Sequence, residues 1–73
     1  MKTKYLSQID GDFLWFRALT KDGYSYIRRE DKGYWSNDRP QFYWSVEDLL
    51  ALGYLPCPYM QATANGKIKV PSV

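Results

Sequence analysis

The chain has 73 residues and a mass of 8.6 kDa, which suits one small domain and leaves no room for a second hydrophobic core. Its composition, 45% hydrophobic and 25% charged, is typical of a globular domain rather than of a disordered segment. With one cysteine and no histidine, neither an internal disulfide nor a zinc site is expected. No apolar run approaches the roughly 20 residues of a transmembrane helix. We therefore expect a single cytoplasmic domain over residues 1–73, with no cofactor, no metal and no membrane partner.

The first half of the chain predicts an antiparallel sheet. Residues 4–9 are expected to form a short strand that ends in the turn Asp10-Gly11-Asp12. Two runs rich in aromatic and branched residues, 13–19 and 24–30, flank a segment that contains Asp22-Gly23, the strongest short signal for a β-hairpin. A turn, a third short strand, a loop and a further extended segment are expected next, at residues 31–33, 34–36, 37–40 and 41–44.

The hairpin divides its side chains between two faces of the sheet, because successive residues of a strand point in opposite directions. If the loop has an even number of residues, one face is aromatic and cationic and holds Trp15, Arg17, Leu19, Tyr24, Tyr26 and Arg28. The other face is then small and apolar, as suits a core, and holds Leu14, Phe16, Ala18, Ser25 and Ile27. A loop with an odd number of residues, or a bulge, would reverse one strand and mix the two sets.

One short helix is predicted near residues 46–52. Ser45 can cap the free amide groups of its first turn, and the acidic residues that follow favour the positive end of the helix dipole. Trp44 can pack against Leu49 across the cap, and Gly53 suits the left-handed residue that ends a helix. The residues expected in the core are Phe16, Ile27, Leu49, Leu50 and Leu52.

The last third of the chain carries two further signals. Pro56-Cys57-Pro58 is expected to be extended but not part of a central paired strand. Asn65-Gly66 favours a tight turn, which predicts a small hairpin between residues 61–64 and 67–70. The whole pattern indicates an α+β fold, a small antiparallel sheet of three to five strands with one short helix on one face. An SH3-like small barrel is the alternative.

Catalysis is not expected from these residues. General acid–base chemistry usually recruits histidine, which the chain lacks. The carboxylate pairs Asp10/Asp12 and Glu47/Asp48 lie at a turn and at a helix start, where acidic residues have ordinary structural roles. Cys57 is flanked by two prolines rather than by a base, and the glycines are too scattered to form a phosphate-binding loop. We therefore expect a protein that is not an enzyme.

The aromatic content favours binding instead. Thirteen residues are Tyr, Trp or Phe, more than a core this small can bury. Tyr, Trp and Arg are enriched in protein interfaces, which favours a protein partner for an adaptor or inhibitor, self-association included. Single-stranded nucleic acid or a nucleotide stacked on the same face is the alternative, although the net charge is only +2. The predicted partner-binding residues are Trp15, Arg17, Tyr24, Tyr26, Arg28, Tyr34 and Trp35.

Charge is unevenly distributed along the chain. Residues 1–36 carry a net +2, residues 37–66 carry −2, and Lys67 and Lys69 make the end of the chain basic again. Basic ends around an acidic middle predict a polarised surface.

Overall fold

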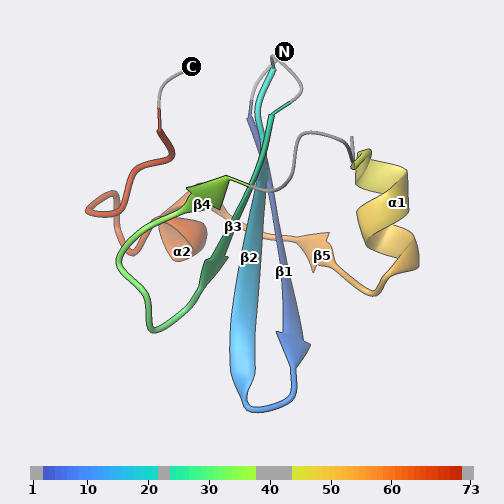
Figure 1. Ribbon diagram of the computed structural model, residues 1–73, viewed down its shortest axis with the longest axis horizontal. Coiled ribbons are helices and arrows are strands. Elements are labelled where there is room, and N and C mark those ends of the chain that lie inside the picture. The colour runs from blue at the N-terminus through green and yellow to red at the C-terminus, as the bar shows by residue number, and fades with distance from the viewer. Residues whose placement is uncertain (1–2, 22–23, 38–43, 72–73) are drawn as a thin grey trace.

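The computed structural model describes residues 3–21, 24–37 and 44–71. These residues form an open antiparallel sheet in the order β4-β3-β2-β1-β5, with two short helices (Figure 1). The element bounds are β1 Lys4–Asp10, β2 Phe13–Leu19, β3 Ser25–Arg29, β4 Ser36–Asn37, α1 Val46–Ala51, β5 Leu55–Pro56 and α2 Tyr59–Ala62. The architecture is that of a small α+β fold, and the SH3-like barrel is not confirmed.

The hairpin of β2 and β3 forms as predicted, but the prediction of its two faces is wrong. Leu19 pairs with Ser25, so five residues, 20–24, separate the paired ends and the loop is odd. Thr20 and Tyr24 close this loop, since the Thr20 amide donates to the Tyr24 carbonyl (2.9 Å) and the Tyr24 amide donates to the Thr20 hydroxyl (3.2 Å). An odd loop places odd-numbered residues of β2 beside odd-numbered residues of β3. Trp15 therefore shares its face with Arg29, and Tyr26 and Arg28 lie on the opposite face.

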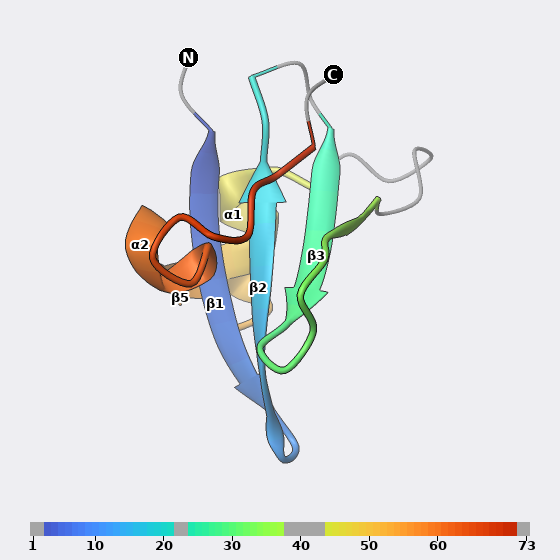
Figure 2. The same ribbon diagram turned by 90° about the vertical axis from the view of Figure 1, so that its left-hand side faces the viewer.

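Each face of the sheet has its own hydrophobic cluster. The side covered by α2 and the C-terminal segment, the α2 face, buries Phe16, Ala18, Tyr26, Trp35 and Ala62. The side covered by α1, the α1 face, buries Leu6, Leu19, Leu49 and Tyr54. Figure 1 shows the two helices on opposite sides of the strands, and Figure 2 looks onto the α2 face, where the C-terminal segment crosses in front of the sheet. The core thus consists of two hydrophobic layers, one on each face of the sheet.

Helix α1 begins and ends as its sequence predicts. The Asp48 amide donates to the Ser45 hydroxyl (3.1 Å) and the Ser45 amide donates to the Asp48 carboxylate (3.0 Å), which completes a capping box. These bonds also hold the pKa of Asp48 below its usual value. Gly53, at φ +98°, is the left-handed residue that ends the helix, and the Tyr54 amide then donates to the Leu49 carbonyl (2.9 Å).

The predicted core is confirmed at Phe16 and Leu49 but is wrong at Leu50 and Leu52, which are 43% and 51% exposed. Helix α1 has only six residues and turns one of them, Leu49, fully into the α1-face cluster. Leu50, the next residue along the helix, therefore points away from the sheet, as does Leu52 at the C-terminal cap. Ile27 is half-buried.

The C-terminal hairpin prediction is wrong. Residues Tyr59–Ala62 form α2, and the chain leaves it through three consecutive left-handed residues, Ala64, Asn65 and Gly66. The Gln61 and Ala62 amides donate to the Pro58 carbonyl (3.1 Å each) and the Thr63 amide donates to the Tyr59 carbonyl (2.9 Å), so helical bonds use amides that a hairpin would have paired. Ile68 and Val70 pack against the α2-face cluster.

The remaining predictions are met in part. Strand β1 and the turn after it are confirmed, and Pro56 lies in the edge strand β5, where it pairs with Leu6 of β1. The third strand is shorter than expected, since only Ser36–Asn37 pairs with β3. Asp22-Gly23 and residues 38–43 lie outside the described residues.

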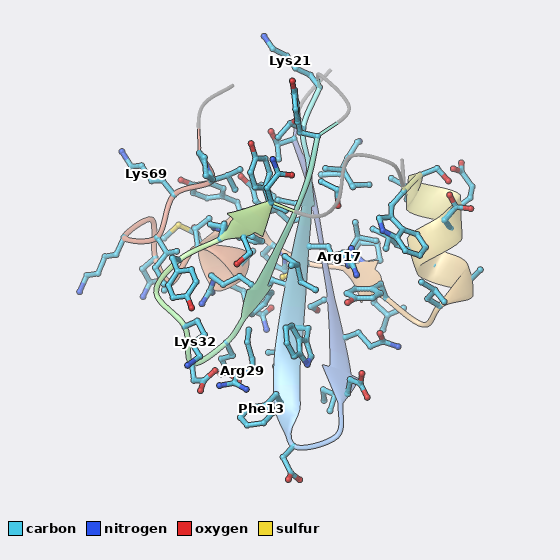
Figure 3. The ribbon with its side chains drawn as sticks, viewed as in Figure 1. Phe13, Arg17, Lys21, Arg29, Lys32 and Lys69 are labelled. Atoms are coloured by element: carbon cyan, nitrogen blue, oxygen red, sulfur yellow. The ribbon has the colours of Figure 1, made fainter. Side chains whose placement is uncertain are left out.

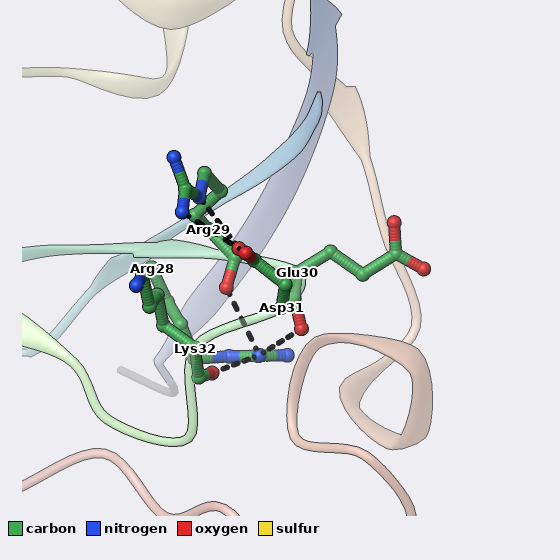
Figure 4. Close-up of polar contacts among 5 residues, drawn as sticks. All are labelled: Arg28, Arg29, Glu30, Asp31 and Lys32. Atoms are coloured by element: carbon green, nitrogen blue, oxygen red, sulfur yellow. Dashed lines mark hydrogen bonds and ion pairs between the residues drawn. The ribbon is translucent and has the colours of Figure 1, made fainter. Parts of the chain in front are cut away.

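Arg28 is the buried cation of the α2 face, with only 3% of its surface exposed. Its Nε and Nη2 atoms donate to the Ala62 carbonyl (3.3 and 2.8 Å). Its Nη1 atom donates to three carbonyls in the loop after β3, those of Arg29, Glu30 and Lys32, at 3.3, 3.1 and 2.7 Å (Figure 4). The guanidinium carbon also lies over the rings of Phe16 and Trp35, at 4.8 and 5.6 Å from their centroids. One side chain therefore joins the end of α2 to the loop after β3.

We expect Arg28→Met to lower the free energy of unfolding by about 3 kcal/mol, because buried carbonyls that lose a charged donor cost roughly 1–3 kcal/mol each. The neighbouring Arg29→Met is the matched control, since its ion pair with Asp31 is at the surface and we expect a loss within about 1 kcal/mol. Urea denaturation followed by tryptophan fluorescence measures both values. Equal losses for the two variants would contradict the structural role of Arg28.

Candidate binding surface

The α1 face is covered over only part of its area. Helix α1 and Tyr54 pack on Leu6 and Leu19, near one end of the sheet. Towards the other end, side chains of β2 and β3 stay at the surface, and Tyr34 joins them from the chain before β4. We call this set the open-face surface; it consists of Phe13, Trp15, Ile27, Arg29 and Tyr34.

The open-face surface is concave. A hollow of about 220 Å³ is lined by Trp15, Ile27, Arg28 and Arg29 from β2 and β3 and by Lys32, Tyr34 and Ser36 from the chain that follows β3. Phe13 and Tyr34 are 40% and 63% exposed, whereas Trp15 and Ile27 are half-buried. The half-buried residues form the floor, and Phe13 and Tyr34 present their rings to the solvent. Figure 3 shows Phe13, Arg29 and Lys32 at the same end of the molecule.

The charge of this surface is largely neutralised within the chain. Arg29 donates from Nε and Nη2 to the two carboxylate oxygens of Asp31, at 2.5 and 2.9 Å. These bonds hold the pKa of Asp31 below its usual value. The Arg29 guanidinium carbon also lies 4.0 Å from the centroid of the Phe13 ring. Arg29 is thus held flat against an aromatic ring, with its charge paired.

Arg17 marks the border between the covered and the open part of the α1 face. Its guanidinium carbon lies 5.3 Å from the centroid of the Trp44 ring and 5.5 Å from that of Tyr54. Its Nε atom donates to the Tyr54 hydroxyl at 3.3 Å. Arg17 therefore joins the sheet to the layer formed by Trp44 and Tyr54.

The structure brings together only some of the seven predicted partner-binding residues. Trp15 and Tyr34 both line the hollow, and Arg17 lies on the same face at its border. Tyr24 is 43% exposed, but it follows the β2–β3 loop, at the end of the strands opposite Phe13 and Arg29. The remaining three, Tyr26, Arg28 and Trp35, were expected at the surface and are buried on the α2 face, with 4%, 3% and 7% exposure.

The sequence reasoning missed Phe13 and Arg29, and it placed Ile27 in the core. The errors at Arg29 and Ile27 follow from the parity of one loop, whereas Phe13 shares β2 with Trp15 and strand alternation alone could have found it. An odd loop pairs Trp15 with Arg29 and Arg17 with Ile27, which puts these four side chains on one face. The alternation of Phe13, Trp15 and Arg17 was visible in the sequence, but the partners on β3 depended on the loop length.

A second hollow lies at the edge of the sheet. It measures about 690 Å³ and is lined by Thr3, Lys4, Tyr5, Leu6, Val46, Pro56, Cys57 and Tyr59. The rings of Tyr5 and Tyr59 meet edge to face in its wall, with centroids 5.5 Å apart and planes at 74°. The lining is mostly apolar and also includes the thiol of Cys57, the amine of Lys4 and the hydroxyls of Tyr5 and Tyr59.

Residues 3–21, 24–37 and 44–71 contain no group of three or more His, Cys, Asp or Glu side chains that could hold a metal ion. Neither described helix is long and apolar enough to cross a membrane. Comparison of the chain with family models, curated proteins and solved structures found no match.

The thiol of Cys57 should react slowly in the folded protein. Burial raises the pKa of Cys57 and outweighs the hydrogen bonds with Ser7 and Ala62, which lower it. Near pH 8.5, where an ordinary thiol is about half ionised, we expect slower reaction with Ellman's reagent in buffer than in urea. Because the folded pKa is the higher one, the stability that the thiol contributes is present at neutral pH and is lost as the pH rises through that pKa. Equal rates in buffer and urea would contradict this protection.

Proposed function

We propose that this protein is a non-enzymatic binding module that acts through protein–protein interaction, as an adaptor or inhibitor of a larger protein. The open-face surface is the contact site of this proposal. The observation that supports it is the hollow lined by Trp15, Ile27, Tyr34 and Arg29, with the charge of Arg29 already paired and its guanidinium against the Phe13 ring.

The composition of this surface is that of an interface core. Aromatic residues and Arg are enriched at the centre of protein interfaces, and Lys and Glu are depleted there. Trp, Tyr and Arg also dominate the residues whose truncation weakens binding most. A ring or aliphatic side chain of a partner that enters the hollow would cover Trp15 and Ile27 and displace water from apolar surface. The exposed rings of Phe13 and Tyr34 would then close around it.

Single-stranded nucleic acid is the alternative occupant, and the charges disfavour it. Bases could stack on Phe13 or Tyr34, but binding to a nucleic acid depends on cations that meet phosphates. Arg29 already donates two hydrogen bonds to Asp31, so a phosphate would have to displace that carboxylate. Arg28 also lines the hollow, but it is buried and donates to backbone carbonyls. Among the residues that line the hollow, Lys32 is therefore the cation left for phosphate contacts. A protein partner requires no such cations.

Site-specific photo-crosslinking tests the proposal. A photoreactive phenylalanine analogue at position 34 is expected to give discrete protein adducts in an extract of the source cells, whereas the same analogue at position 24 gives none. Tyr24 is the matched control because it is an exposed tyrosine outside the open-face surface. Trp15→Ala in the same chain should weaken adduct formation roughly tenfold or more, as truncation of a central interface residue costs about 1–3 kcal/mol. Adducts of equal yield from positions 34 and 24 would contradict the proposal.

A fluorescence titration separates the two occupants. Trp15 lies in the floor of the hollow, so a base stacked there would quench tryptophan emission. We expect a short mixed-sequence single-stranded oligonucleotide to produce no saturable change, even at low salt. Saturable quenching that weakens as salt is added, and that Tyr34→Ala abolishes, would replace the protein partner by nucleic acid.

A further inference from the structure

Two adjoining segments in the second half of the chain carry charges of opposite sign. Residues 44–53, which contain α1, include Glu47 and Asp48 but no Lys or Arg. Residues 54–71, which contain α2 and the C-terminal segment, include Lys67 and Lys69 but no Asp or Glu. All four of these side chains are exposed. Each segment therefore presents charge of a single sign.

Exposed apolar side chains accompany both charged segments. On α1, Leu50 lies one turn after Glu47 and so on the same side of the helix, and Leu52 follows at the cap; they are 43% and 51% exposed. On α2, Tyr59 and Met60 are 46% and 53% exposed. The Asn65 amide donates to the Met60 carbonyl (2.8 Å), which holds the chain that leads to Lys67 against α2. We call these two patches the acidic side, Glu47, Asp48, Leu50 and Leu52, and the basic side, Tyr59, Met60, Lys67 and Lys69.

The fold places the acidic and basic sides on opposite faces of the sheet. Leu49 of α1 packs in the cluster of the α1 face, whereas Ala62 of α2 and Ile68 between the two lysines pack in the cluster of the α2 face. Figure 1 shows α1 and α2 on opposite sides of the strands, and Figure 3 shows Lys69 on the side away from α1. Strand β5, which pairs with the edge of β1, carries the chain from one face to the other.

We propose that copies of this chain associate head to tail, with the acidic side of one copy on the basic side of the next. The two sides match in sign, and each provides apolar surface that the other can cover. Because they lie on different faces of the molecule, the contact is heterologous, and its repetition leads beyond a dimer, to an open stack unless the rotation between copies closes a ring. Each side consists of few residues, which places the contact at the weak end of specific interfaces, below about 1,200 Å². This association uses neither Trp15 nor Tyr34 and does not depend on the proposed function.

Sedimentation equilibrium tests the stack. At low salt the weight-average mass should rise steadily with protein concentration above 8.6 kDa, without the plateau of a dimer. Added salt should lower the association constant at least tenfold between about 50 and 500 mM, because it screens charges at the surface. A wild-type protein that stays at the monomer mass up to millimolar concentration overturns the proposal.

A charge exchange makes the test specific. Lys67→Glu/Lys69→Glu makes the basic side acidic. Glu47→Lys/Ala51→Lys makes the acidic side basic and leaves the bonds between Ser45 and Asp48 in place. Each variant alone carries two sides of the same sign, so both should sediment as monomers. An equimolar mixture should associate again, since each variant supplies the side that the other needs.

Lys21→Glu/Lys32→Glu is the matched control, because it changes the net charge as much as Lys67→Glu/Lys69→Glu does, at exposed positions outside both sides. We expect it to associate like the wild type. Circular dichroism confirms that every variant is folded. A mixture that remains monomeric overturns the proposal. So does an association that the charge variants leave unchanged and that Tyr34→Ala abolishes, since the open-face surface would then be the contact between copies.

Discussion

The buried guanidinium of Arg28 is the interaction on which the α2 face depends. A charged group with 3% exposure requires hydrogen-bond partners, and Arg28 finds them in the carbonyl of Ala62 and in three carbonyls of the loop after β3. These partners belong to segments that are distant in the sequence and that have little regular structure of their own. The rings of Phe16 and Trp35, which belong to the buried cluster of the α2 face, lie close to the guanidinium and exclude water from it. The hydrogen bonds of Arg28 thus attach the end of α2 to the sheet, as strand pairing would have done for a C-terminal strand.

The closed α2 face determines where a partner can bind. Tyr26, Arg28 and Trp35, which resemble binding residues by type, are used there to hold the fold together. Among the described residues, the six of α1, with Trp44 and Tyr54, cover the opposite face near one end of the sheet. Trp15, Ile27 and Arg29 therefore stay at or near the surface. The same shortage of covering residues leaves Leu50 and Leu52 exposed beside the acidic residues of α1. Both proposed contacts thus follow from the limited amount of chain available to a small domain.

Residue type alone does not separate structural from binding arginines in this protein. Arg28 and Arg29 are adjacent in β3 and point to opposite faces. One donates to backbone carbonyls in the interior, and the other lies on Phe13 and pairs with Asp31 at the surface. Arg17 is intermediate, held between two aromatic rings at the border of the open-face surface. Each of these three arginines lies near an aromatic ring, so burial and hydrogen-bond partners distinguish their roles.

The sequence by itself determined the features that depend on neighbouring residues: strands β1 to β3, the capping box of Ser45 and Asp48, and the end of α1 at Gly53. It also predicted that Trp15 and Tyr34 belong to one candidate surface, which the structure supports by placing both in the same hollow. Tertiary structure decided the rest. The length of the β2–β3 loop set which residues of β3 join Trp15, and packing against Phe16 and Trp35 held residues 67–70 on the α2 face in place of the predicted hairpin. Pairing parity and burial depend on contacts between distant segments, and local residue preferences carry no information about those contacts.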